Sequence, residues 1–262
     1  MPELPEVELA RRYLEDHVLG RRISRVKVLD EGILEGVGPE ALREYLMNLS
    51  FTAAKRHGKQ LFLELEERGC LTLHLGMTGG LSFSAEDGPP AKHDRLLLDF
   101  EDGGQLVFND QRKFGAISYS PSKRRYIMQK HLGPDALMIS RRDFVERVGS
   151  HDRAVKTTIM DQHVVAGIGN LYSDEILFQA RVHPMVLSSS VRSRGLGRMR
   201  DIVRTVLQAS LQVGTDFSQL PRGFMLRDRS AGAPCPRRNG RLESLVVGGR
   251  TAFICPSCQP SP

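Results

Sequence analysis

The sequence predicts an α+β protein with two domains: a β-sandwich with flanking helices, followed by a mainly helical domain that ends in a β-hairpin. Two observations support this prediction. Apolar and polar residues alternate in short runs between about Ile23 and Tyr119, whereas beyond Ser140 apolar residues recur at helical spacing. A chain of 262 residues is long enough for one large or two medium domains.

In the first half, Pro5–Leu19 is expected to form a helix because its apolar residues share one face and a proline lies near its start. A second, short helix is expected over Glu40–Leu49. Gly103 and Gly104 are expected to turn a hairpin between two of the strands. The strand-like runs are Leu61–Glu66, Leu71–Leu75, Arg95–Phe100 and Gln105–Phe108.

The second half begins after a polar, basic stretch, Pro121–His131, that we interpret as a helical link. Ser140 and Asp143 form a capping-box pattern. Ser188–Gly197 is rich in Ser, Arg and Gly and is expected to be a mobile connection. Further helices are expected over Phe144–Val148, Val155–Met160, Leu171–Ala180 and Met199–Val213, and a final hairpin over Leu242–Val247 and Thr251–Ile254 with Gly248-Gly249 at its turn.

These patterns give four predicted regions. They are an N-terminal sandwich domain (1–120), a linker (121–134), a helical domain (135–228) and a terminal hairpin region (229–262).

The charge of the chain favours an anionic partner. Net charge is +6, and residues 220–250 contain seven arginines but only two acidic residues. The planar guanidinium suits phosphate oxygens, although a solvated basic surface is the alternative. The arginines are Arg222, Arg227, Arg229, Arg237, Arg238, Arg241 and Arg250.

Several classes of protein are excluded. The acidic N-terminus has no apolar run, which excludes a signal peptide, and no segment is apolar over the roughly 20 residues of a membrane span. Four cysteines do not form a disulfide framework in a chain of this size. Three of them lie near the C-terminus, which favours metal binding in a reducing cytoplasm. We expect a cytoplasmic protein, nucleoid-associated if it is bacterial or archaeal, that acts as a monomer and needs no organic cofactor.

The first residues, Met1-Pro2-Glu3, carry a candidate nucleophile. Removal of Met1 leaves Pro2 with a free secondary amine. The pKa of an α-amino group lies near 7.7–8, so a useful fraction is unprotonated at neutral pH and can act in covalent catalysis. Glu3 is a candidate general acid beside it. Alternatively, Pro2 and Pro5 simply begin a helix, with Glu3 complementing the helix dipole.

Met1–Glu8 resembles the opening of the formamidopyrimidine-DNA glycosylase and endonuclease VIII family, and five further segments resemble that family in the same order. They are His57–Leu61 (a lysine segment), His74–Gly79 (a loop with a methionine wedge), Asn109–Gly115 (an Arg-x-Phe-Gly intercalation loop), Val165–Glu175 (a helix–two-turn–helix signature) and Gly249–Cys258 (the end of a zinc finger). The resemblance implies a β-sandwich domain, a helix–two-turn–helix domain and a zinc-finger-like hairpin.

The resemblance also implies catalytic residues. Pro2 attacks the sugar C1′ of a damaged nucleotide, Glu3 donates a proton, and Lys59 and Arg250 assist the elimination that cuts the strand. The expected activity is therefore that of a bifunctional glycosylase and lyase acting on damaged double-stranded DNA.

The DNA contacts implied by the resemblance fall into two groups. Met77, Arg112 and Phe114 fill the gap left by a base rotated out of the duplex, and Arg112 bonds the unpaired partner base. Gly167–Asn170 fits a turn whose amides hold a phosphate at the start of a helix, an ordinary helix cap being the alternative. The other contacts are His74, His93, Arg153, Lys156, Asn170 and Tyr172.

The chain departs from the family pattern in two places. Cys235, Cys255 and Cys258 are candidate zinc ligands, but Arg238 stands where a fourth cysteine is expected, and structural zinc almost always takes four protein ligands. Either water or an outside ligand is the fourth zinc ligand, or no zinc is bound and the packing of its side chains stabilises the hairpin. The stretch Asp216–Pro234 is also short for a loop that covers an oxidised purine.

Three hypotheses therefore stay open. The first is excision of formamidopyrimidines, with 8-oxoguanine in doubt; the second is an endonuclease VIII-like preference for oxidised pyrimidines; the third is a non-catalytic protein that binds lesions.

Overall fold

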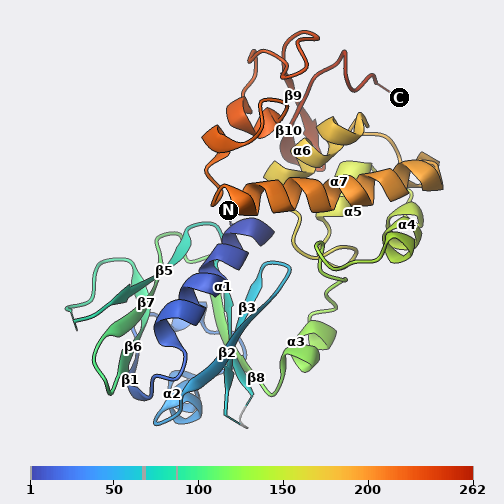
Figure 1. Ribbon diagram of the computed structural model, residues 1–262. Coiled ribbons are helices and arrows are strands. Elements are labelled where there is room, and N and C mark those ends of the chain that lie inside the picture. Colours follow the sequence, from blue (N-terminus) through green and yellow to red (C-terminus); the bar gives the residue numbers. More distant parts are fainter. Residues whose placement is uncertain (1, 67–68, 87, 262) are drawn as a thin grey trace. The chain divides into compact units, whose positions relative to one another are not determined.

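The computed structural model describes residues 2–66, 69–86 and 88–261, which form two compact units (Figure 1). The first unit contains Pro2 and Glu6–His131, and the second contains Glu3–Pro5 and residues 132–261. The first helix, α1 (Leu4–Val18), therefore supplies residues to both. Leu4 is buried in the core of the second unit, and Val7 is buried in the core of the first.

The first unit is built on two four-stranded antiparallel sheets. One has the strand order β1-β6-β7-β5, and the other has the order β2-β3-β4-β8. The strands are β1 (Ile23–Val28), β2 (Phe51–His57), β3 (Gln60–Leu65), β4 (Cys70–His74), β5 (Gly79–Ser84), β6 (Asp94–Phe100), β7 (Gln105–Asp110) and β8 (Ala116–Ser120). Alternate apolar residues such as Leu61, Leu63, Leu96 and Leu98 meet in one core, as the period-two pattern requires.

Three more helical segments belong to this unit: the short 3₁₀ turn η1 (Glu31–Ile33), α2 (Pro39–Leu46) and α3 (Lys123–Gln129). The predicted turn at Gly103-Gly104 is present, with φ of 90° and 88°. These positive values suit glycine because it lacks a Cβ atom.

The second unit is helical and ends in a two-stranded hairpin. Its elements are α4 (Arg141–Gly149), α5 (Val155–Met160), α6 (Asn170–Ala180), η2 (Ser188–Ser190), α7 (Ser193–Gln212), η3 (Phe217–Gln219), η4 (Met225–Asp228), β9 (Glu243–Val247) and β10 (Arg250–Ile254). Helix α6 contacts α5, α7, η4 and β10, so most of its residues are buried (Figure 1).

Comparison with the sequence-based expectation confirms the fold class, including the strand-rich first half and the helical second half. The cap at Ser140 is present, because its hydroxyl accepts a hydrogen bond from the amide of Asp143 at 3.0 Å. The loose connection expected over Ser188–Gly197 is wrong, since η2 and the first turn of α7 occupy it. A hydrogen bond from Ser188 to Thr158 and the burial of Leu196 hold this segment in place.

The finer domain boundaries at residues 120, 134 and 228 stay predictions. Among the described residues, no helix is long and apolar enough to cross a membrane.

Candidate functional site

The carboxylate of Glu3 is fixed at the N-terminus of α6. Its Oε2 accepts hydrogen bonds from the amides of Gly169 (2.6 Å) and Tyr172 (3.4 Å), and its Oε1 accepts one from Leu171 (2.8 Å). The side chain is only 3% exposed. The positive end of the helix dipole and three N–H donors thus hold an anionic group directly after Pro2 in the chain.

Two glycines make room for this arrangement. A Cβ atom at Gly169 would lie 2.3 Å from the carboxyl carbon of Glu3, and one at Gly167 would lie 2.6 Å from a methyl group of Leu4. The amide of Leu4 also donates to the carbonyl of Gly167 at 3.0 Å. The sequence left two hypotheses open for the turn Gly167–Asn170, a phosphate site or an ordinary helix cap. The amide of Gly169 bonds Glu3, which favours the cap, and the amides of Leu171 and Tyr172 just beyond the turn bond Glu3 as well.

Pro2 and Lys59 both belong to the first unit. Pro2 is half-buried. Lys59 lies in the tight turn between β2 and β3, next to Gly58 with φ of 57°, and is 8% exposed. Its ammonium lies near His74 on the neighbouring strand β4: burial and then Lys59 lower the pKa of His74. His74 is therefore mainly neutral at pH 7, and it accepts a hydrogen bond from the amide of Gly76 at 3.2 Å.

Met77, Arg112 and Phe114 lie on two loops whose ends meet. Met77 is 39% exposed and Phe114 is 55% exposed, and the guanidinium of Arg112 lies 5.0 Å from the centre of the Phe114 ring. Isolated exposed side chains of this size are common, but these three lie together on two loops that pack against each other. We call these three residues the apolar tip.

Asp110 holds the two loops together. It is fully buried and accepts hydrogen bonds from the Thr78 hydroxyl (2.5 Å) and from the amides of Arg112 (3.1 Å) and Gly115 (2.6 Å). Burial alone would raise the pKa of Asp110, but these hydrogen bonds outweigh it and the pKa lies below its usual value. His93 lies beside this junction, since its carbonyl accepts from the amide of Asp110 at 2.8 Å.

Arg153 and Arg250 line one pocket of about 210 Å³ in the second unit. Arg250 is exposed at the start of β10, while Arg153 is paired with Asp161 at 2.5 Å. The Nε of Arg153 is buried without a hydrogen-bond partner in the described part of the chain. Two guanidinium groups against the one carboxylate of Asp161 leave the lining of this cavity with an excess of positive charge, which suits an anion. The other lining residues are Thr157, Met160, Asp161, Val247 and Gly248.

Three other predicted DNA contacts have internal partners. Asn170 donates from its side-chain nitrogen to the carbonyl of Thr251 at 3.1 Å. Tyr172 is fully buried and bonds Ser210 at 2.6 Å. Lys156 is 1% exposed and pairs with Asp174 at 2.5 Å. Their direct DNA contacts stay predictions, and the observed bonds assign each of them to the packing of the second unit.

The sequence analysis did not single out Asp110, Asp174 or Glu175. Each is a buried acidic residue inside a segment that resembles the family: Asp110 in Asn109–Gly115, and the other two in Val165–Glu175. A buried carboxylate is rare unless it has partners, but burial on one helix or strand cannot be recognised from residue type alone. For Asp174 and Glu175 the one available signal was their place in the largely apolar sequence of α6, whereas Asp110 has polar neighbours and gave no such signal.

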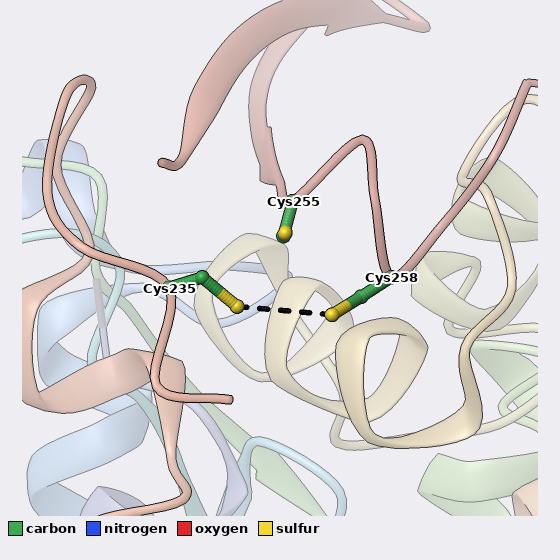
Figure 2. Close-up of side chains that lie close together, drawn as sticks. All are labelled: Cys235, Cys255 and Cys258. Atoms are coloured by element: carbon green, nitrogen blue, oxygen red, sulfur yellow. Dashed lines mark hydrogen bonds between the residues drawn. The ribbon is translucent and has the colours of Figure 1, made fainter. Parts of the chain in front are cut away.

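The thiols of Cys235, Cys255 and Cys258 converge at the base of the hairpin (Figure 2). Their Sγ atoms all lie within 4.8 Å of one another, and those of Cys235 and Cys258 are 3.7 Å apart. Sulfurs at about 2.3 Å from a tetrahedral zinc ion are about 3.8 Å from each other, so the three thiols fit as ligands of one metal ion.

A fourth protein ligand is not found among the described residues. No other Cys, His, Asp or Glu of that part of the chain joins the group. Arg238, at the position of the expected fourth cysteine, is exposed and has a positive φ of 59°. Polar side chains bond the sulfur of Cys258: Asn239, whose amide donates at 3.5 Å, and Arg237.

Comparison with known proteins identifies both halves of the chain. Residues 1–117 match the family model of the formamidopyrimidine-DNA glycosylase N-terminal domain, and residues 132–221 match that of its H2TH domain. The formamidopyrimidine-DNA glycosylase of Pelobacter propionicus is 37% identical over 99% of this chain and its own whole length. That of Streptococcus mutans is 33% identical over 99% of both chains.

Solved structures of formamidopyrimidine-DNA glycosylases also match the fold of this chain. The Lactococcus lactis formamidopyrimidine-DNA glycosylase, bound non-covalently to DNA containing an AP site, matches with a TM-score of 0.90 at 28% identity, covering 99% of this chain and 100% of that one. The same enzyme in complex with DNA containing Fapy-dG matches with a TM-score of 0.89 at 28% identity over the same shares. The chain belongs to the formamidopyrimidine-DNA glycosylase family.

Proposed function

We propose that this protein is a bifunctional DNA glycosylase of base excision repair that removes oxidised bases and then cuts the strand. The main support is the position of Glu3. A buried carboxylate, bonded by the amides of Gly169 and Leu171, directly follows the residue that becomes the N-terminus when Met1 is removed. A helix cap could be supplied by many side chains, but only this arrangement also places an acid beside a secondary amine.

In the proposed reaction the nitrogen of Pro2 forms a bond to C1′ of the damaged nucleotide, and the bond from C1′ to the base breaks. Glu3 takes the proton that the Pro2 nitrogen loses when this bond forms and passes it to the sugar ring oxygen, which opens the ring. The departing base takes its proton from water. The nitrogen lone pair then gives an iminium ion at C1′. No redox step or organic cofactor is involved.

Strand cleavage follows by elimination from this iminium ion. Loss of a proton from C2′ expels the 3′ phosphate, and a second elimination expels the 5′ phosphate. Lys59 and Arg250 assist these steps by stabilising the phosphate charge. The pocket shared by Arg153 and Arg250 supports a role for this region in binding a phosphate.

The apolar tip is proposed to enter the duplex where the damaged base is rotated out. Rotation costs a few kcal/mol of stacking and pairing, and an inserted Met77 or Phe114 side chain replaces part of the lost stacking. Arg112 bonds the unpaired base opposite. His74 and His93, beside the same loops, are proposed contacts of the DNA backbone.

Formamidopyrimidine is the proposed substrate class, since the similar enzymes are named for it and one of the similar structures holds DNA containing Fapy-dG. The stretch Asp216–Pro234 is short for a loop that covers an oxidised purine, which is why 8-oxoguanine is not the proposed substrate. Oxidised pyrimidines are the alternative, and a panel of duplexes with one lesion each separates them.

The three thiols are proposed to take zinc with a fourth ligand from outside the chain. Such an ion would link the segment around Cys235 to the end of β10 and would have a structural role. We further propose that the protein acts as a monomer in the cytoplasm.

Borohydride reduction on DNA carrying an abasic site tests the proposal. The wild-type protein should form a covalent adduct whose peptide map places it on Pro2. Pro2→Gly, or a form that retains Met1, should bind the same DNA without forming the adduct. A wild-type protein that binds this DNA but is never trapped would instead be the non-catalytic lesion-binding protein.

A further inference from the structure

The C-terminal hairpin is attached to α6 by hydrogen bonds distributed along that helix. Asn170 bonds β10 near its start, Asp174 bonds β10 further along, and the last turn of the helix accepts bonds from Arg237. Gln259, after the last cysteine, bonds the carbonyl of Val182 just beyond the helix. None of these contacts uses a sulfur atom.

Asp174 is the centre of this attachment. It is 1% exposed, and its Oδ2 accepts two bonds from the guanidinium of Arg229 (2.9 and 2.6 Å) and one from the amide of Phe253 (3.0 Å). Its Oδ1 accepts from Lys156 at 2.5 Å. One buried carboxylate is thus shared by α5, the segment before the cysteines, and the middle of β10.

Arg229 contributes packing as well as charge. Its guanidinium carbon lies 4.5 Å from the centre of the Phe253 ring, so the side chain lies between the carboxylate of Asp174 and an aromatic side chain of β10. A planar, bidentate guanidinium that also covers a ring fixes orientation, which a lysine ammonium would not do. Its side chain is 18% exposed, so most of this contact is screened from water.

The hydrogen bonds between α6 and β10 lie close to Arg250, so they affect the residue that is proposed to bind DNA. Arg250 is the first residue of β10, three residues before Phe253, and its side chain is exposed. Fixing the amide of Phe253 and the carbonyl of Thr251 fixes the strand that carries Arg250. The incomplete set of thiols lies at the opposite end of the same strand, at Cys255.

We propose that Asp174 and Arg229 are positioning residues: they hold β10 so that Arg250 meets a DNA phosphate, and they do so without a bound metal. This inference rests on the proposed function in that Arg250 is taken to contact DNA. It assigns the orientation of the hairpin to an ion pair between protein side chains.

A double-mutant cycle tests the role of Arg229. The readout is the Kd for a duplex containing a tetrahydrofuran abasic analogue, measured for wild type, Arg229→Gln, Arg250→Ala and the double variant, with thermal melts to confirm folding. Arg229→Gln should weaken binding by about tenfold in the wild-type background but by less than about twofold when Arg250 is already absent. Arg147→Gln, which removes an exposed positive charge from α4, is the control for charge alone.

Equal losses in the two backgrounds would show that Arg229 does not act through Arg250 and would overturn the proposal. Arg229→Lys should restore only part of the affinity, because it keeps the charge but loses the bidentate geometry. If Arg229→Gln does not fold, the proposal is tested instead by measuring DNA binding of the wild-type protein after its metal has been removed.

For that measurement the reduced wild-type protein is treated with a chelator until it carries no measurable metal. Affinity for the same duplex should then change by less than about twofold, and a loss of about tenfold or more would overturn the proposal. Borohydride trapping on an abasic duplex is run in parallel. Binding without trapping contradicts the proposed chemistry alone, whereas binding lost only on metal removal contradicts the positioning role alone.

Discussion

The carboxylate of Glu3 and the amide of Gly169 are joined by a hydrogen bond of 2.6 Å, although 166 positions separate them in the chain. The contact depends on the absence of a side chain at Gly169, because a Cβ atom there would lie 2.3 Å from the carboxyl carbon. Gly169 itself has φ of −124°, which any residue can adopt, so the requirement for glycine is one of space.

Gly169→Ala should therefore impair catalysis by moving Glu3. Single-turnover excision of a damaged base should fall by about 10²-fold, since a displaced general acid loses most of its contribution. Cleavage at a preformed abasic site, where no base has to leave, should fall less. Gly38→Ala is the control, because nothing lies within 4 Å of a Cβ atom there. Unchanged excision in Gly169→Ala would argue against Glu3 as the proton donor.

Phe114→Ala should reduce excision without affecting the fold. The ring is 55% exposed, so its loss should change the free energy of unfolding by less than about 0.5 kcal/mol. Excision from duplex DNA should slow by roughly tenfold, because part of the stacking lost on base rotation is no longer replaced. Met138→Ala, at a methionine that is 80% exposed, should alter neither property. Equal activity of both variants would remove the apolar tip from the mechanism.

Asp110→Asn should destabilise the first unit in a pH-dependent manner. Because the folded-state pKa of Asp110 is lowered, its stabilising contribution is present above the unfolded-state pKa and is lost as the pH falls through the folded-state value. The variant should be less stable by about 1–3 kcal/mol at pH 7, since an amide cannot accept all the bonds of the carboxylate. Urea denaturation should show this difference shrinking below about pH 4, and a constant difference would contradict the assignment.

Glu175→Gln should have the opposite effect on how stability depends on pH: it should stabilise the protein as the pH rises. Burial raises the pKa of Glu175 to about 7, even though Gln179 and the amides of Leu226 and Met225 bond the carboxylate. A carboxyl group with a raised folded-state pKa loses stability as the pH rises from the unfolded-state value through the folded one. Relative to wild type, the variant should therefore gain about 2 kcal/mol between pH 5 and pH 8 in chemical denaturation. A difference that does not change with pH would show that Glu175 is charged throughout.

Features set by neighbours in sequence could be predicted well. The alternation in β3 and β4, the cap at Ser140 and the glycine turns at Gly103 and Gly248 depend on local geometry, and the structure contains each of them. The fold class followed from these local patterns because the two periodicities occupy separate halves of the chain.

Features set by distant partners could not be predicted. Nothing near Asp174 in sequence indicates that Arg229 and Phe253 bond it, and Lys156 looks like a surface residue until its partner is known. The turn at Gly169 was predicted correctly as the start of a helix, but the sequence left open whether its amides hold a phosphate or only cap the helix. A carboxylate from the N-terminus satisfies the same donors, and only the folded chain distinguishes the two.

The assignment of Glu3–Pro5 to the second unit has a consequence for how such proteins can be recombined. A chimera that joins residues 1–131 of one relative to residues 132–261 of another brings in a foreign Leu4 and Glu3 against Gly167 and Gly169. We expect such chimeras to fold only when residues 3–5 and the C-terminal half come from the same relative. A fragment that starts at Leu132 would leave the space of Leu4 unfilled and the three amides that bond Glu3 without that partner, so the second unit should fold well only with these opening residues.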